Sequence, residues 1–196
     1  MVLLSQKEGE TLLILFKDFS NFYNANSISK VLGISHVGAQ KIFKRLHSQN
    51  LLVNKKIGKS IIYKLDLKES YVFKLISFLL VDEANDFKRW KEEFRELCKG
   101  DRIIAIFGSS IKNYSKAEDI DIMIIMDKKD LNEVNDILKK KEKILPKNLH
   151  AIKMTNEDLL KNIKKKEKVI MDIVKNAVIL YGQGKYMEII KNVTSF

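Results

Sequence analysis

With 196 residues, 45% of them hydrophobic and one proline, the chain can form one large domain or two small ones and is not disordered. Its formal net charge of +11 favours polyanionic partners, but an A/T-rich or thermophilic genome also raises lysine content, so the position of the charges has to decide. No apolar run is long enough to cross a bilayer, no secretory leader is recognisable, and the lone Cys98 cannot form an internal disulfide. We therefore expect a cytoplasmic protein with no membrane partner.

The first third of the sequence has the spacing of a helix-turn-helix. An amphipathic helix is predicted from Glu10 to Phe19, a short second helix from Ser27 to Leu32, and a third helix from His36 to Asn50. Gly33 can adopt a left-handed turn before the third helix, and Ser35 can cap that helix. Its predicted buried stripe consists of Ala39, Ile42, Phe43 and Leu46.

The opposite face of the third helix suits the major groove of DNA. Gln40 can read an adenine edge, and Lys41 or Arg45 can contact a guanine edge or a phosphate. The predicted DNA-binding residues of this helix and its cap are Ser35, His36, Val37, Gln40, Lys41, Lys44 and Arg45.

Residues 51–65 predict two strands joined by a basic turn that contains Gly58. Lys55, Lys56 and Lys59 near the tip of this hairpin can contact the DNA backbone beside the groove. From Ser27 to Leu65 the elements resemble the winged helix-turn-helix domains of small prokaryotic transcription regulators, which implies DNA binding. The alternative is a module for protein interaction or dimerisation with a solvated basic face.

Residues 68–99 contain no proline or glycine and are compatible with a continuous helix. The first part, 71–81, is apolar enough to require burial on either neighbouring domain or against a second copy of the chain. We therefore expect a homodimer. Trp90 in the second part is interpreted as a packing residue rather than a platform for stacking bases.

A Gly-Ser turn follows the next apolar run. Residues 103–107 predict a buried strand, after which Gly108 lets the backbone turn sharply and approach a ligand. Ser109 and Ser110 offer hydroxyl and backbone donors to phosphate oxygens.

An Asp-X-Asp pair opens the following apolar run. Successive side chains of a strand point to opposite faces, so Asp119 and Asp121 project to one side while Ile120 and Ile122 pack into the core. Such carboxylates repel each other and lose hydration unless a cation compensates, which predicts a magnesium site. The alternative is an ordinary turn followed by a solvated acid pair.

These motifs resemble a known family. Phe107-Gly108-Ser109 and Asp119-Ile120-Asp121-Ile122 are similar to the signature of minimal nucleotidyltransferases in the DNA polymerase beta superfamily, and residues 177–182 resemble the closing strand of small prokaryotic members. The resemblance covers about the C-terminal half of the chain and implies magnesium-dependent transfer of a nucleotidyl group. It assigns catalysis to Asp119, Asp121 and Ser109, Mg²⁺ to the two aspartates, and the triphosphate to Gly108, Ser109 and Ser110.

One departure from the family concerns a third carboxylate, which active members generally carry on a later strand. The candidate strand, residues 149–154, contains none. His150, Glu157 and Asp158 are candidates to substitute for it, but Thr155 and Asp158 are better explained as a helix capping box. Turnover of a nucleotide is therefore an open question.

The remaining C-terminal pattern continues the α/β alternation. Helices are predicted at 130–143 and 156–176, the latter in one or two pieces, strands at 149–154 and 177–181, and a short helix or tail at 185–196. The run from Lys164 to Lys166 is predicted to lie on a solvated helix face.

The expected fold class is α+β. We predict a winged helix-turn-helix domain at 1–66, a helical connector at 67–99, a nucleotidyltransferase-like domain with a mixed sheet at 100–184 and a tail at 185–196. The leading functional hypothesis is a DNA-binding protein that binds Mg²⁺ and a nucleoside triphosphate and transfers a nucleotidyl group to an unknown acceptor. One alternative is a transcription regulator whose C-terminal domain is inactive and senses a nucleotide or mediates assembly. Another is a nucleotidyltransferase-type antitoxin with a helical toxin partner.

Overall fold

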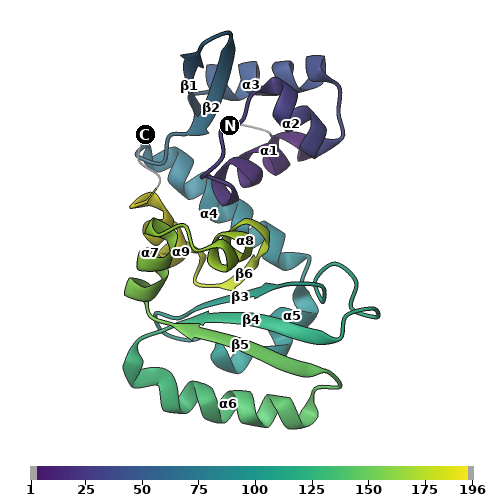
Figure 1. The fold of residues 1–196 in the computed structure, drawn as a ribbon, viewed down its shortest axis with the longest axis vertical. Coiled ribbons are helices and arrows are strands. Elements are labelled where there is room, and N and C mark those ends of the chain that lie inside the picture. The colour runs from purple at the N-terminus through teal and green to yellow at the C-terminus, as the bar shows by residue number, and fades with distance from the viewer. Residues whose placement is uncertain (1–3, 194–196) are drawn as a thin grey trace. The chain divides into compact units, whose positions relative to one another are not determined.

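The computed structural model describes residues 4–193, and contacts divide the chain into two compact units, residues 1–79 and 80–196 (Figure 1). Helices and a small antiparallel hairpin form the first unit, and helices around a four-stranded mixed sheet form the second. The predicted α+β class is confirmed. Among the described residues, no helix combines the length and the apolar character needed to span a bilayer.

The first unit has the element order of a winged helix: α1 (Gln6–Lys17), α2 (Ala25–Leu32), α3 (His36–Ser48), β1 (Leu52–Ile57) and β2 (Ser60–Leu65). Helix α1 begins four residues before the predicted start because Ser5 and Glu8 form a capping box there. The fully buried side chains at the centre of this unit include Leu12, Phe16, Ile28, Phe43 and Leu46.

The turn between α2 and α3 confirms the predicted helix-turn-helix geometry. Gly33 ends α2 in the left-handed conformation with φ of 62°. Ser35 Oγ accepts a hydrogen bond of 3.0 Å from the amide of Gly38 at the start of α3. The two caps fix the direction in which α3 leaves the turn.

Aromatic stacking packs the hairpin against α3. Tyr63 on β2 lies parallel to Phe43 on α3, with 4.3 Å between ring centroids. The hairpin turns at Gly58, which has a φ of 57°, and residues Lys55, Lys56 and Lys59 around the turn are all exposed. The predicted wing is therefore present, with its basic residues in solvent.

The segment predicted as a continuous helix is broken into α4 (Ser70–Asn85), α5 (Lys88–Glu93) and the 3-10 helix η1 (Arg95–Leu97). The chain changes direction at residues 86–87, and this bend lets α5 and η1 bury Trp90, Phe94 and Leu97 in the core beside the sheet of the second unit. Trp90 is 5% exposed, as expected of a packing residue.

The sheet of the second unit consists of β3 (Ile103–Phe107), β4 (Asp119–Ile125), β5 (Asn148–Met154) and β6 (Val178–Tyr181), in the order β5-β4-β3-β6. Strand β4 runs parallel to β5 and antiparallel to β3, and β3 runs antiparallel to β6. The sheet is mixed, as predicted. The parallel pair is joined by a crossover through η2 (Lys128–Asp130) and α6 (Leu131–Ile144).

Helices cover both faces of this sheet. In Figure 1, α6 lies on one side, and α7 (Asn156–Lys164), α8 (Lys168–Asn176) and α9 (Gln183–Lys191) lie on the other. The side chains of Ile120, Ile122 and Ile124 join the core that includes α6 residues Val134 and Ile137. Because strand side chains alternate, the odd-numbered residues of β4 face away from α6.

One C-terminal expectation needs correction in part. Lys164, Lys165 and Lys166 are exposed as expected, but they do not share a helix face, because α7 ends at Lys164 and Lys166 adopts a positive φ of 54°. Residues 183–191 form helix α9, which agrees with the short helix expected as one alternative for this segment, and Tyr186, Met187 and Ile190 on it are buried. Residues 194–196 of the predicted tail lie outside the described residues.

Candidate functional site

Two carboxylates lie on one face at the start of β4. Asp119 and Asp121 are 31% and 26% exposed, whereas Ile120 between them is fully buried. The predicted alternation of this strand is therefore confirmed, and the acid pair faces away from the α6 core. Half-buried carboxylates this close in sequence favour a bound cation or hydrogen-bond donors.

The Gly-Ser turn and the second carboxylate form one compact arrangement. Phe107, the last residue of β3, pairs with Asp121, and Gly108 follows with a φ of 80°. A Cβ added to Gly108 would stand 2.1 Å from Asp121 Oδ2, far inside contact distance. The glycine is thus required both by its backbone conformation and by the carboxylate packed against it.

The two serines of the turn differ in exposure. Ser109 is exposed, and its carbonyl accepts hydrogen bonds from the amides of Lys112 and Asn113 at 3.1 and 2.9 Å. Ser110 is buried, and its hydroxyl lies 3.5 Å from the carbonyl of Phe107. Ser109 is therefore the serine of the turn that is accessible to a ligand, while Ser110 stabilises the turn.

His150 lies where a carboxylate on the neighbouring strand would meet the acid pair. It is the register partner of Asp121 across the parallel strands, and its Nδ1 lies 3.6 Å from Asp121 Oδ1 and 3.8 Å from Asp119 Oδ2. Asn148, two residues earlier on the same face of β5, donates a hydrogen bond of 3.3 Å to Asp119 Oδ1. Sequence reasoning missed Asn148, although the two-residue spacing to His150 on a strand indicates a shared face.

Asp158, another candidate for a third carboxylate, has a structural explanation. Thr155 and Asp158 form the predicted capping box at the start of α7, with Thr155 Oγ1 and Asp158 Oδ2 2.9 Å apart. The hydrogen bond from the Thr155 backbone amide lowers the pKa of Asp158. Asp158 thus caps a helix, and β5 contributes an imidazole but no carboxylate to the acid pair.

The residues present fit a hard cation through two carboxylates. Within residues 4–193, no group of three or more His, Cys, Asp and Glu side chains is arranged as an assembled metal site, so the acid pair and His150 do not converge on one point. Mg²⁺ commonly takes only one or two protein carboxylates and completes its octahedron with phosphate oxygens and water. Asp119 and Asp121 meet that requirement.

The predicted DNA-binding face of α3 is exposed along its length. His36, Val37, Gln40, Lys41, Lys44 and Arg45 all reach solvent. A hollow of about 350 Å³ lies between α3 and the wing, and its lining brings together His36, Gln40, Lys44 and Lys59. It also includes Asn24 and Asn26 at the start of α2, which sequence reasoning had not selected.

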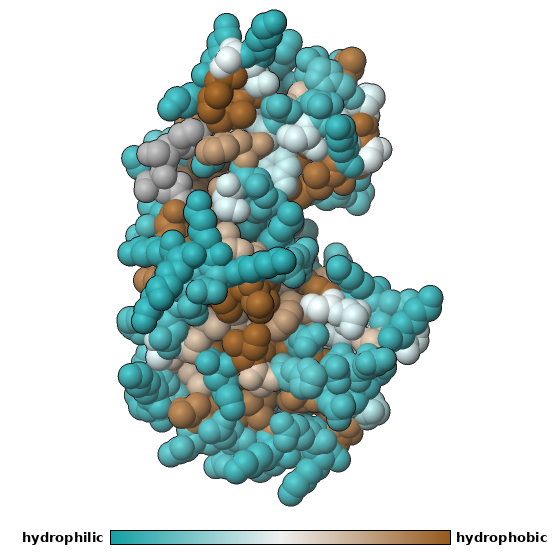
Figure 2. Space-filling view, in the orientation of Figure 1, coloured by the Kyte–Doolittle hydropathy of each residue, from teal (hydrophilic) through white to brown (hydrophobic). Residues whose placement is uncertain are grey.

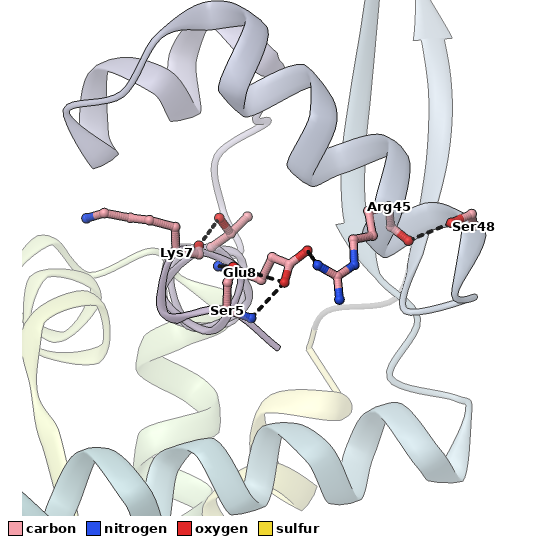
Figure 3. A network of polar contacts seen from close by, with 6 residues as sticks. Ser5, Lys7, Glu8, Arg45 and Ser48 are labelled. Atoms are coloured by element: carbon pink, nitrogen blue, oxygen red, sulfur yellow. Dashed lines mark hydrogen bonds and ion pairs between the residues drawn. The ribbon is translucent and has the colours of Figure 1, made fainter. Parts of the chain in front are cut away.

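Arg45 has a second contact that the helical spacing did not indicate. Its guanidinium pairs with Oε1 of the buried Glu8 on α1 at 3.3 Å, and Glu8 Oε2 accepts a hydrogen bond of 2.8 Å from the Ser5 amide (Figure 3). Arg45 therefore links α3 to α1 within the first unit, and Lys41 and Lys44 have no such carboxylate partner among residues 4–193.

The wing is partly hydrophobic as well as basic. Figure 2 shows a brown patch over the β1–β2 hairpin, and the exposed hydrophobic residues of the hairpin are Val53, Ile57 and Ile61. Exposed hydrophobic side chains are not expected on a face that only contacts solvent and phosphates, so this surface also suits contact with a protein.

The comparisons with known proteins divide along the chain. Residues 92–183 match the family model described as "Polymerase beta, Nucleotidyltransferase". The matched segment of this chain contains the Gly-Ser turn, the acid pair and His150. This part of the chain is a nucleotidyltransferase-type domain, and it follows a winged-helix unit. A search of curated proteins finds no match.

Solved structures similar to this chain include two bacterial proteins. One is the adhesin competence repressor AdcR from Streptococcus pyogenes, at 13% identity and a TM-score of 0.38, with 73% of this chain and 83% of that chain covered. The other is ZitR from Lactococcus lactis, at 13% identity and a TM-score of 0.36, with 74% and 78% covered.

Proposed function

We propose that the protein binds DNA through its winged helix and binds Mg²⁺ with a nucleoside triphosphate on its C-terminal unit, where it transfers a nucleotidyl group to an acceptor hydroxyl. The observation that carries the proposal is the packing of Gly108 against Asp121. This packing supports the proposal because a turn that binds phosphate has to lie beside a carboxylate that holds the metal. The match of residues 92–183 to the nucleotidyltransferase family model supports the same conclusion.

Each protein group has a distinct part in this reaction. Ser109 offers its hydroxyl to the triphosphate, and Asp119 and Asp121 hold the cation, which supplies charge neutralisation when bound. The acceptor oxygen bonds to the α-phosphorus, the bond from that phosphorus to the bridging oxygen breaks, and pyrophosphate leaves. Catalysis comes mainly from positioning and electrostatic stabilisation.

In the proposed reaction His150 is the general base that accepts the proton of the acceptor hydroxyl. Its Nδ1 faces the two carboxylates at 3.6 and 3.8 Å, so Nε2 is the ring nitrogen directed to other groups. An imidazole can therefore supply the base that a third carboxylate would otherwise provide.

The experiment is a titration with each nucleoside triphosphate and magnesium, with pyrophosphate release measured in the same samples. We expect Asp119→Asn/Asp121→Asn to lose both binding and release, His150→Ala to keep binding and lose release, and His150→Asp to recover release. His36→Ala, which changes a histidine of the other unit, serves as the matched control. Absence of magnesium-dependent binding by the wild type would refute the proposal.

A second candidate function is a transcription regulator in which the C-terminal unit binds a nucleotide without turnover. The lack of a carboxylate on β5 favours it, and nucleotide binding without pyrophosphate release in the presence of a range of acceptors would support it. The antitoxin hypothesis, with a helical toxin partner, is tested by the identity of the neighbouring gene and by co-purification.

The DNA part of the proposal rests on the hollow between α3 and the wing. Four of the predicted contact residues line it, and their cations and amides suit a sugar-phosphate backbone and base edges. Charge reversal at Lys41 and Lys44 should weaken binding to promoter-region DNA and flatten its salt dependence. Unchanged binding would instead favour the protein-contact alternative for which Val53, Ile57 and Ile61 argue.

The proposed assembly is a homodimer, supported by apolar residues that α4 leaves in solvent. Tyr71 and Phe78 on this helix are 53% and 62% exposed. Light scattering should give the mass of two chains for the wild type and of one chain for Phe78→Glu, and a monomeric wild type would contradict the proposal.

A further inference from the structure

A pair of cations shares one aromatic ring in the second unit. Arg89 on α5 places its guanidinium carbon 3.9 Å from the ring centroid of Tyr114, and Lys147 places its Nζ 4.8 Å from the same centroid. The ring of Trp90 meets Tyr114 edge to face at 5.5 Å, and Arg89 lies 5.2 Å from Trp90. Both cations therefore contact the ring of the same tyrosine.

Within the described part of the chain, no carboxylate neutralises these two cations. Among residues 4–193, neither Arg89 nor Lys147 forms an ion pair with a carboxylate, and the Lys147 ammonium donates a hydrogen bond to the carbonyl of Ala117. Glu118 in the same loop is exposed and pairs with neither cation. Each cation therefore carries a charge that no described carboxylate compensates, so an anion beside Arg89 and Lys147 is electrostatically favourable.

The cation pair lies next to the candidate catalytic residues. Ala117, which accepts the hydrogen bond from Lys147, precedes Asp119 by two residues. Lys147 is followed by Asn148, whose amide donates to Asp119. Tyr114 belongs to the loop 108–118 that begins with the Gly-Ser turn, and this loop also carries the exposed Lys112. Basic groups thus border one side of an acidic site.

We propose that Arg89 and Lys147, presented on the ring of Tyr114, form a phosphate-binding site separate from the Gly-Ser turn. A guanidinium offers paired donors that match two oxygens of a phosphate, and an ammonium adds a compact charge. The ligand is a phosphate group, carried by the acceptor molecule or by the nucleotide. This inference goes beyond the proposed function and holds whether or not the acid pair supports turnover.

The fluorescence of Trp90 can report phosphate binding at this site. Trp90 is the one tryptophan of the chain, and Arg89 lies over its ring, so movement of the guanidinium toward a phosphate should change the fluorescence of a single known residue. Inorganic phosphate is titrated into the full-length protein without nucleotide or magnesium, at constant ionic strength set with sodium chloride. Broadening of the phosphorus-31 signal of phosphate is measured in the same samples as a second readout.

Matched variants distinguish phosphate binding at this site from a general effect of the protein's positive charge. Arg89→Ala and Lys147→Ala should each weaken phosphate binding about tenfold or more, the size expected for a charge-assisted contact. Arg95→Ala and Lys143→Ala remove equal charges from nearby exposed positions and should bind as the wild type does. Circular dichroism confirms that each variant is folded.

The outcomes decide the proposal. Saturable phosphate binding that Arg89→Ala and Lys147→Ala reduce, and the controls do not, supports the site. Absence of saturable binding in both readouts, or equal loss in all four variants, overturns it. A further titration in the presence of saturating Mg-ATP distinguishes the sources: loss of the phosphate response assigns the site to the nucleotide, and an unchanged response assigns it to the acceptor.

Discussion

Replacement of Gly108 by alanine should damage the candidate site more than its small size suggests. The added Cβ would stand 2.1 Å from Asp121 Oδ2 and 3.0 Å from Asp121 Cγ, on a backbone with φ of 80°. Neither the strand that carries Asp121 nor the turn can move away easily, because Phe107 and Asp121 are register partners in the sheet. The carboxylate must therefore swing out of its position.

The loss of folding stability caused by Gly108→Ala has two parts, and a second glycine of the same unit allows them to be measured separately. Gly100 also has a positive φ, 57°, but a Cβ added there meets nothing within 4 Å. Gly100→Ala should cost only the conformational penalty, about 1 kcal/mol. Gly108→Ala should cost about 2–4 kcal/mol, because the displaced carboxylate and the strained turn add to that penalty.

The assay combines urea unfolding with nucleotide titration in magnesium. We expect Gly100→Ala to bind nucleotide as the wild type does and Gly108→Ala to lose most of its binding, because both the turn and Asp121 change position. Equal stability of the two variants, together with intact nucleotide binding by Gly108→Ala, would refute the close packing of turn and carboxylate on which the proposed function rests.

Three further predictions concern the rest of the chain. Arg45→Ala should lower the stability of the winged-helix unit by about 1–2 kcal/mol in thermal unfolding, because the buried Glu8 loses its ion pair, whereas Lys41→Ala should leave stability within error. Burial, and then the hydrogen bond to a buried aspartate, raise the pKa of Tyr23; the unfolded chain therefore releases this proton first, and stability should fall as the pH rises above about 10. Tyr23→Phe should flatten that alkaline decline in pH-dependent unfolding, and an unaltered slope would argue against it. Thr155→Ala should cost about 1 kcal/mol through loss of the α7 cap while nucleotide affinity stays the same, and a fall in affinity would show that the capping box supports the site.

Local patterns allowed much of the fold to be predicted. The Gly33 and Ser35 signals depend on backbone conformation and capping within a few residues, and the structure has both. The alternation of Asp119 to Ile122 depends only on strand geometry, so the shared face of the two carboxylates followed directly. These features needed no knowledge of distant parts of the chain.

Features that depend on contacts between distant segments could not be predicted in the same way. The break at residues 86–87 has no glycine or proline signal and arises because Trp90 and Phe94 pack beside the sheet. The ion pair of Arg45 joins residues 37 positions apart, and helical spacing alone gives only an outward direction. The contact of His150 with the acid pair required the strand order and register, which a single sequence does not provide.

The order of strands in the sheet has a consequence for how the site can change. The Gly-Ser turn and both aspartates come from one continuous segment, β3 to β4, whereas His150 is supplied by β5 after a crossover through α6. Under the proposed function, the residues that would bind the nucleotide and the metal therefore belong to one segment, and the residue that would accept the proton belongs to another. Position 150 could then be exchanged without changing the β3–β4 hairpin, so substitutions on a single neighbouring strand would be enough to convert such a protein between a sensor and a catalyst.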